Sequence, residues 1–354
     1  MIAGAPPALA FPALSWWWLA WVGLVPLLLV VRAAPTAMQG AVRAWVGMTG
    51  FVLITQYWLW PAAGPLLIVL AVGLGTLWLP WGWAAHRLLS GEHTICRVVA
   101  AVVVLPSWWV LAEAARSWDK LGGPWTLLGA SQWNQPATLA SASVGGVWLV
   151  SFLIVAVNTA VVGALLVRTA WLVALPIALA IVSPAWFWWG PAPAEGSSVR
   201  IALVQPGDIE DATARQAAGE ALTETLAGQQ LDLVVWGESS VGVDLGSHPD
   251  AMARLVELRR RIGADLLVNV DARAPSGGIY KSSVLIGPSG ALGSYSKTRL
   301  VPFGEYVPLR PLLGWATSHT KAAAEDRRRG DGPAVLHADS LAVGPLISFE
   351  ATFS

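Results

Sequence analysis

The chain changes character within FWWGPAPAEGSSVRIALVQPG, residues 187 to 207, and this stretch decides how the fold is divided. Residues 1–190 contain seven Lys/Arg and three Asp/Glu, whereas residues 191–354 contain fifteen and nineteen. Tryptophan is divided in the same way, since 20 of the 22 lie before Gly190. Apolar runs with few charges and flanking indoles are typical of membrane helices. The sequence therefore predicts an all-α membrane bundle over residues 1–190 and a second domain over residues 191–354.

The first domain consists of apolar runs that are long enough to cross a bilayer, which takes about 20 residues. A shorter run at residues 2–14 contains prolines and leaves the number of spans at six or seven. The six predicted spans lie near residues 16–31, 45–60, 66–85, 98–115, 146–167 and 170–189.

The basic residues between the predicted spans indicate the orientation of the bundle. Connections on one side carry five arginines, whereas those on the other side carry one arginine and one lysine with acidic residues nearby. By the positive-inside rule the first side is cytoplasmic, which places the domain after Gly190 outside the cytoplasm. The five arginines are Arg32, Arg43, Arg87, Arg97 and Arg168, and the opposite pair is Arg116 and Lys120.

The loop at residues 116–136, RSWDKLGGPWTLLGASQWNQP, joins two predicted spans on the same side as the second domain. Two interpretations stay open: an interfacial loop, or a lipid-facing wall beneath the second domain with Trp125 and Trp133 as its lipid-facing residues. Glu113 and Asn158 lie within or at the edge of spans, where polar groups are often functional. A helix–helix hydrogen bond would explain Asn158 equally well.

The composition gives no sign of a metal, a cofactor or a nucleic-acid partner. Lys+Arg and Asp+Glu each number 22, so bulk charge does not favour a polyanion. The single cysteine, Cys96, excludes a disulfide within the chain, and the five histidines show no metal-ligand spacing. We therefore expect neither a metal site nor a cofactor.

From Ser198 onward, short apolar runs alternate with charged helical stretches, which is typical of an α/β domain. Two apolar runs about an SG turn predict a hairpin. The predicted order is a strand at 199–207, a helix at 211–229, a strand at 231–239, a helix at 249–262, a strand at 264–272, and a hairpin formed by 281–288 and 291–297.

Three reactive side chains stand where predicted strands end, which is where chemistry collects in α/β sheets. Glu238 follows LVVW, Lys297 ends the hairpin, and Ser348 follows AVGPLI. Each alone has an ordinary explanation, as a helix cap, a surface lysine or a strand serine. A Glu, a Lys and a small nucleophile at three strand ends, in that order, are harder to explain in this way. If residues 347–351 form a strand, Ser348 and Glu350 share one of its faces.

The chain resembles the apolipoprotein N-acyltransferases, whose soluble domain belongs to the nitrilase superfamily. The resemblance extends over essentially the whole chain and implies an αββα sandwich for residues 191–354, preceded by membrane spans. The segment at 295–310 is the most specific. The similar segments are IALVQPG at 201–207, LVVWGESS at 233–240, YSKTRLVPFGEYVPLR at 295–310, ISFEATF at 347–353 and GPWTLLGASQ at 123–132.

The resemblance implies a Glu-Lys-Cys trio, with Glu238 as the base, Lys297 as the cation that stabilises the electrophile, and position 348 as the nucleophile. Glu305 and Glu350 correspond to two further carboxylates near the site. This chain has Ser348 where the family has its cysteine. A serine hydroxyl needs a stronger base than a thiol does, so we expect the chain as written to be nearly inactive.

The implied reaction moves a fatty acyl chain from a phospholipid, through an acyl-enzyme, to the α-amino group of a diacylglyceryl-cysteine apolipoprotein. It would take place at the outer face of a bacterial inner membrane. Two alternatives remain open: a membrane-anchored amidase, and a non-catalytic lipid or lipoprotein binder. The family continues past its nucleophile with further strands, helices and a membrane span, so we expect the second domain to be incomplete on its C-terminal side.

Overall fold

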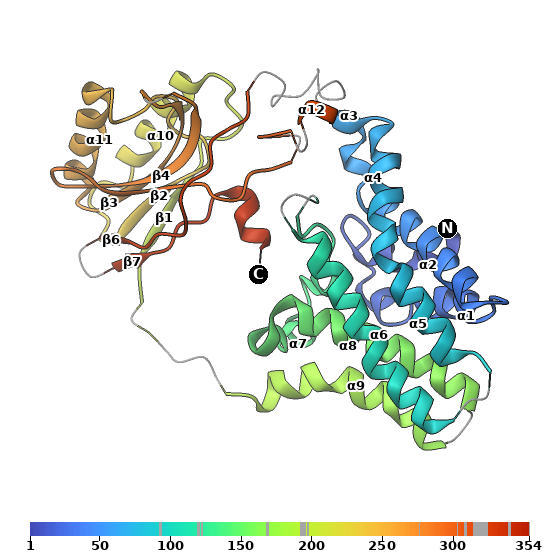
Figure 1. The fold of residues 1–354 in the computed structure, drawn as a ribbon. Helices are drawn as coiled ribbons and strands as arrows, with labels where there is room; N and C mark the ends of the chain where they lie inside the picture. The colour runs from blue at the N-terminus through green and yellow to red at the C-terminus, as the bar shows by residue number, and fades with distance from the viewer. Residues whose placement is uncertain are drawn as a thin grey trace. The chain divides into compact units, whose positions relative to one another are not determined.

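The structure is a computed structural model, and it describes residues 1–91, 94–118, 121, 123–167, 170–191, 196, 198–275, 277–302, 304–307, 310–313, 325–338 and 341–353. Arg168 and Lys120, which enter the predicted orientation, lie outside the described residues. The chain divides into two compact units, Met1–Pro193 and Ala194–Phe353, whose elements are labelled in Figure 1.

In the described part of the first unit every regular element is a helix, and four helices there are long and apolar enough to cross a membrane: Ala37–Thr55, Leu66–Leu89, Ile95–Arg116 and Ala142–Val167. Two shorter apolar helices cover Trp17–Arg32 and Ala174–Trp189. The α-helices are α1 (Val25–Arg32), α2 (Ala37–Thr55), α3 (Trp60–Ala63), α4 (Leu66–Gly75), α5 (Leu79–Leu89), α6 (Ile95–Arg116), α7 (Pro136–Leu139), α8 (Ala142–Val167) and α9 (Ala170–Trp189).

Two predicted spans differ from the structure. Residues 2–14 are not a continuous helix but contain the short 3-10 turns η1 (Ile2–Gly4) and η2 (Pro6–Ala10), because prolines remove the backbone donors that a helix needs. The span predicted at 45–60 begins earlier, at Ala37, where the Thr36 hydroxyl accepts a hydrogen bond from the Gln39 backbone and caps α2.

Asn158 is buried in α8 and satisfies its amide entirely with backbone groups. Its Oδ1 accepts from the Leu24 amide at 2.9 Å, and its Nδ2 donates to the Ala20 carbonyl at 2.9 Å and to Ile154 in its own helix at 2.8 Å. Asn158 thus ties α8 to the turn that leads into α1, so the structural explanation for this polar residue holds.

We expect Asn158→Leu to destabilise the first unit by about 2 kcal/mol or more, because it leaves the buried Leu24 amide and Ala20 carbonyl without their partner. Thermal unfolding in detergent measures the effect. Thr159→Val is the matched control, since the buried Thr159 hydroxyl bonds only to Val155 in its own helix. Equal melting temperatures for the two variants would show that the tie is unimportant.

The second unit is a layered α/β domain. Its main sheet has the order β1-β2-β3-β4-β5, with β1, β2 and β3 parallel and β3, β4 and β5 antiparallel. A second, two-stranded sheet pairs β6 with β7. The elements are β1 (Ile201–Val204), α10 (Ala212–Glu224), β2 (Leu233–Trp236), α11 (Pro249–Ile262), β3 (Asp265–Arg273), β4 (Ile279–Gly287), β5 (Gly290–Ser296), α12 (Arg310–Leu313), β6 (Leu336–Ala338), β7 (Leu341–Val343) and the 3-10 turn η9 (Ser348–Thr352).

The main sheet is covered on both faces. One face packs against α11, where Leu255 and Leu258 join Val234 and Leu266 in a single buried cluster. On the other face Leu336 of β6 joins a second cluster with Leu233, Leu267 and Leu285 of the main sheet. Figure 1 shows α10 and α11 beside the sheet and β6 and β7 on its other side. The described part of this unit therefore has an α layer, the main sheet and a small second sheet.

The predicted hairpin is confirmed as β4 and β5, and the predicted helix at 249–262 is confirmed as α11. The expected strand at 347–351 is wrong. The preceding strand β7 ends at Val343, and Ser348–Thr352 forms the 3-10 turn η9. Pro345 has no amide with which to extend a ladder, and the Glu350 carboxylate accepts a hydrogen bond from the Ile347 amide at 3.0 Å, which closes the turn.

Candidate active site

Ser348 is the first residue of η9 and has an unusual backbone conformation. Its φ of 53° lies in the left-handed region, which few residues other than glycine adopt and which is often found at functional sites. Its side chain is exposed, and its hydroxyl lies close enough to the Glu238 carboxylate to act on it. The turn therefore presents Ser348 at the surface of the second unit, next to a carboxylate.

Glu238 follows β2 in a sharp turn. The next residue, Ser239, also has a positive φ of 55°, and its amide donates to the Asn269 side chain at 2.7 Å. Partial burial raises the pKa of Glu238, but the hydrogen bond and charge of Lys281, aided by Ser348 and Lys297, outweigh it and hold the pKa below its usual value. Glu238 is thus ionised at neutral pH, as a general base must be.

Lys297 follows β5 and is completely buried. Its ammonium lies 2.9 Å from both carboxylate oxygens of Glu305. Glu305 also accepts a hydrogen bond from the Val301 amide at 2.9 Å, so its own position is fixed. Glu305 therefore orients the cation that acts on Glu238.

Glu350 ties the Ser348 turn to the loop after β5. One of its oxygens accepts from the Tyr295 hydroxyl at 2.6 Å, from the Thr298 amide and hydroxyl at 2.7 and 2.8 Å, and from the Arg299 amide at 3.0 Å. Burial raises the pKa of Glu350, but these donors, Tyr295 first, hold it below its usual value. Glu350 thus acts as an anchor for the turn.

All five residues named by sequence reasoning in this domain are in one unit, and the structure adds a sixth, Lys281. Its ammonium forms an ion pair with Glu238 and lies 3.6 Å from Glu305. In the sequence Lys281 is only the first residue of a predicted strand. The signal that could have found it is its cross-strand pairing with Asp271, which depends on the register of β3 and β4.

The two lipid-facing candidates lie in the first unit. Trp133 is 57% exposed, and Trp125 packs on Trp58 with ring centroids 4.9 Å apart. The buried Glu113 of α6 fixes their loop by accepting a hydrogen bond from the Leu128 amide at 2.7 Å. An apolar pocket of about 460 Å³ lies beside Trp58, lined by Leu53, Tyr57, Trp58, Trp60, Pro61 and Leu67.

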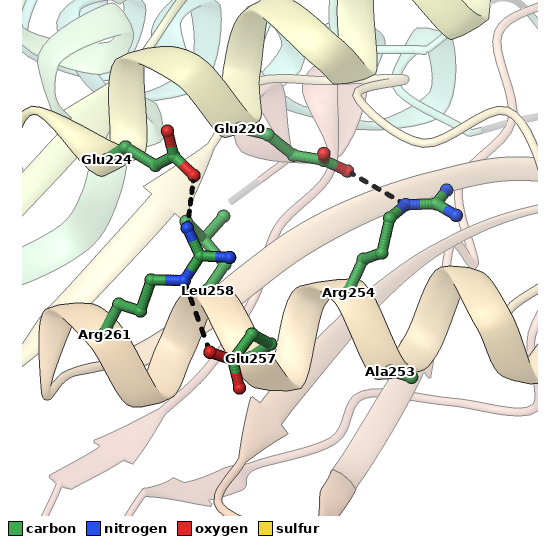
Figure 2. A pocket seen from close by; sticks show the side chains of 7 residues that line it. All are labelled: Glu220, Glu224, Ala253, Arg254, Glu257, Leu258 and Arg261. Carbon is green, nitrogen blue, oxygen red and sulfur yellow. Dashed lines mark hydrogen bonds and ion pairs between the residues drawn. The ribbon is translucent and has the colours of Figure 1, made fainter.

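A groove of the α/β unit lies between α10 and α11 and is shown in Figure 2. Arg261 pairs there with Glu224 at 2.8 Å and with Glu257 at 3.3 Å. These exposed side chains form a surface ion-pair network, and the groove shares no residue with the Ser348 site. Among the described residues, no group of three or more His, Cys, Asp or Glu side chains is arranged to hold a metal ion.

Comparisons with known proteins give one consistent result. The apolipoprotein N-acyltransferase N-terminal domain matches residues 3–160. An apolipoprotein N-acyltransferase of Pseudomonas syringae pv. tomato is 30% identical over 81% of this chain, and the chain spans 58% of that protein. Those of Azotobacter vinelandii and Geobacter metallireducens are 28% and 27% identical over 100% of this chain, which spans 72% of each.

Among solved structures, a CN-hydrolase superfamily protein of Xanthomonas campestris is similar at 22% identity and a TM-score of 0.34, over 44% of this chain and 55% of that one. The match to the N-terminal domain, the similarity to two relatives over the whole of this chain and the four long apolar helices agree with one another. The chain has four helices that fit a membrane protein, and it is similar to apolipoprotein N-acyltransferases.

Proposed function

We propose that this chain acts on the substrates of its family, transferring a fatty acyl group from a phospholipid to the N-terminal amine of a diacylglyceryl-cysteine apolipoprotein. The observation that supports the proposal is that the Ser348 hydroxyl and the buried Lys297 cation both act on the Glu238 carboxylate.

The chemistry divides into two balanced steps. In the first, the residue 348 oxygen attacks the ester carbonyl of the phospholipid while Glu238 takes the hydroxyl proton. The ammonium of Lys297 stabilises the oxyanion of the tetrahedral intermediate. As that intermediate collapses, the lysophospholipid oxygen leaves with the proton from Glu238, and an acyl ester remains on residue 348.

In the second step the apolipoprotein amine attacks this ester. Glu238 takes a proton from the amine and returns one to the departing residue 348 oxygen. The product is an amide, and the site is restored. Glu305 supports the reaction by fixing Lys297, and Glu350 supports it by fixing the turn that carries residue 348.

A non-catalytic lipid or lipoprotein binder is the second candidate, and two observations favour it. The nucleophile position holds a serine, and the carboxylate that would activate it is already paired with Lys281. A serine hydroxyl needs an effective base, because its own acidity is very low. In such a protein the same site would hold the ester without cleaving it.

The transfer assay that separates these functions supplies phospholipid and a diacylglyceryl-cysteine peptide to membranes containing the chain. Mass spectrometry of the peptide then shows whether its amine has gained an acyl group. Acylated peptide supports the transferase. Release of free fatty acid without peptide acylation would favour a membrane-anchored hydrolase or amidase. Lipid retention without either product would favour the binder.

We also propose that the second unit faces away from the cytoplasm of the bacterial inner membrane and follows the αββα plan of nitrilases. The expected result is that a cysteine at position 250, in a Cys96→Ser background, reacts with an impermeant maleimide on intact cells. Cys96 must be removed because it is an exposed free thiol. A cysteine at position 90 is the matched control and should stay protected. The reverse labelling pattern would invert the topology.

A further inference from the structure

Lys281 lies at the meeting point of the charged groups around Glu238. It stands on β4 directly opposite Asp271 of β3, and its carbonyl accepts a hydrogen bond from the Lys297 amide at 2.8 Å. Strand pairing therefore places Lys281 beside Asp271 in the sheet and beside Lys297, the first residue after β5. Only 11% of that side chain is exposed.

The Lys281 ammonium faces three carboxylates. It forms an ion pair and a hydrogen bond with Glu238, and it lies 3.6 Å from Glu305 and 3.8 Å from Asp271. An ammonium has three donors and no acceptor, so it is suited to a position among carboxylates. Lys297, in contrast, is bonded to Glu305 and reaches Glu238 only through its charge.

Arg327 adds a third cation by pairing with Oδ1 of Asp271, whereas the Lys281 ammonium lies nearest to Oδ2. The charged side chains in this cluster are then three acids and three bases: Glu238, Asp271 and Glu305, with Lys281, Lys297 and Arg327. Removing Lys281 alone would leave three carboxylates facing two cations. The residue at 348 would then meet a more negative site.

We propose that Lys281 is a positioning residue, a second ammonium that fixes the Glu238 carboxylate beside residue 348 and sets the charge which the nucleophile meets. The role of residue 348 as a nucleophile rests on the proposed acyl-transfer function. The placement of Glu238 and the charge at residue 348 do not, because both can be measured without any lipid.

The test uses a thiol at position 348 as a reporter. In the full chain carrying Cys96→Ser and Ser348→Cys, the only thiol is the one at the site, and its rate of alkylation by iodoacetamide follows the thiolate fraction. Alkylation is measured against pH by intact-protein mass spectrometry. Because a nearby cation favours the thiolate, adding Lys281→Met should move the midpoint of the profile to higher pH by about one unit or more.

Three further variants make the result specific. Lys281→Arg keeps the charge and should shift the midpoint by less than half as much. Lys281→Gln keeps a donor for Glu238 without the charge, and it should show the upward shift even if the methionine variant fails to fold. Arg254→Met removes a cation from α11, whose acidic neighbour Glu220 lies 3.9 Å away and outside this site, and should leave the midpoint unchanged.

An unchanged or lowered midpoint in both folded neutral variants would overturn the role of Lys281. A shift of the same size in Arg254→Met would overturn it as well, because the effect would then be one of net charge. Neither outcome bears on acyl transfer, which is judged separately by adduct formation with phospholipid.

Discussion

Ser348→Cys is expected to make the chain accumulate a covalent acyl adduct when phospholipid is supplied, whereas the serine form should be nearly inactive. A thiol ionises far more readily than a hydroxyl, with a reference pKa of about 8.5. The site adds to this difference, because Lys297 and Lys281 favour an anion beside them. Intact-protein mass spectrometry should show one fatty-acyl increment on the cysteine form.

The adduct has controls that identify it as an intermediate. Cys96→Ser in both forms removes the natural cysteine, so an acyl increment cannot come from its exposed thiol. The increment should disappear when a diacylglyceryl-cysteine peptide is added, and the peptide should gain the same mass. An equal increment on the unaltered serine form would show that Ser348 is itself a competent nucleophile. Absence of any increment on a folded cysteine form would favour the binding protein over the transferase.

Lys297→Met is expected to reduce adduct formation in the Ser348→Cys background by a factor of about one hundred or more, as removal of an oxyanion-stabilising group does elsewhere. It should also lower the free energy of unfolding of the second unit by about 3–5 kcal/mol, because the buried Glu305 would lose the cation bonded to it and keep only the Lys281 ammonium, 3.6 Å away. Initial rates of acylation and pulse proteolysis in urea measure the two effects.

The double variant Lys297→Met/Glu305→Gln separates chemistry from stability. Both charges of the buried pair are gone, and the glutamine can still accept the Val301 hydrogen bond, so the free energy of unfolding should recover to within about 1–2 kcal/mol of the parent. Adduct formation should stay lost. Recovery of acylation together with stability would mean that Lys297 acts only as a structural partner of Glu305.

The sequence by itself determined the division of the chain and the order of its α/β elements. Charge and tryptophan both change near Gly190, because a bilayer excludes charged side chains and favours indoles at its interface. Two apolar runs about the SG turn predict β4 and β5, and the charged stretch between two apolar runs predicts α11. These are local signals, and the segments that carry them need no distant partner to be recognised.

The candidate site was only partly accessible in this way. Glu238 and Lys297 could be selected as residues at strand ends, and the structure places their charges together. The conformation around Ser348 could not, because alternating residues after Val343 favoured a strand. The turn forms instead through five hydrogen bonds to the Glu350 carboxylate, four of them from Tyr295, Thr298 and Arg299, some fifty residues away in the chain.

Two further features depended wholly on tertiary structure. Asn158 bonds to Ala20 and Leu24, more than 130 residues distant, once α8 packs beside the turn before α1. Lys281 meets Glu238, Asp271 and Glu305 only because β3 and β4 pair in one register, and a shift of one residue would turn its side chain to the other face of the sheet. Periodicity along one segment indicates which face a side chain is on, but strand register and helix packing decide what it meets there.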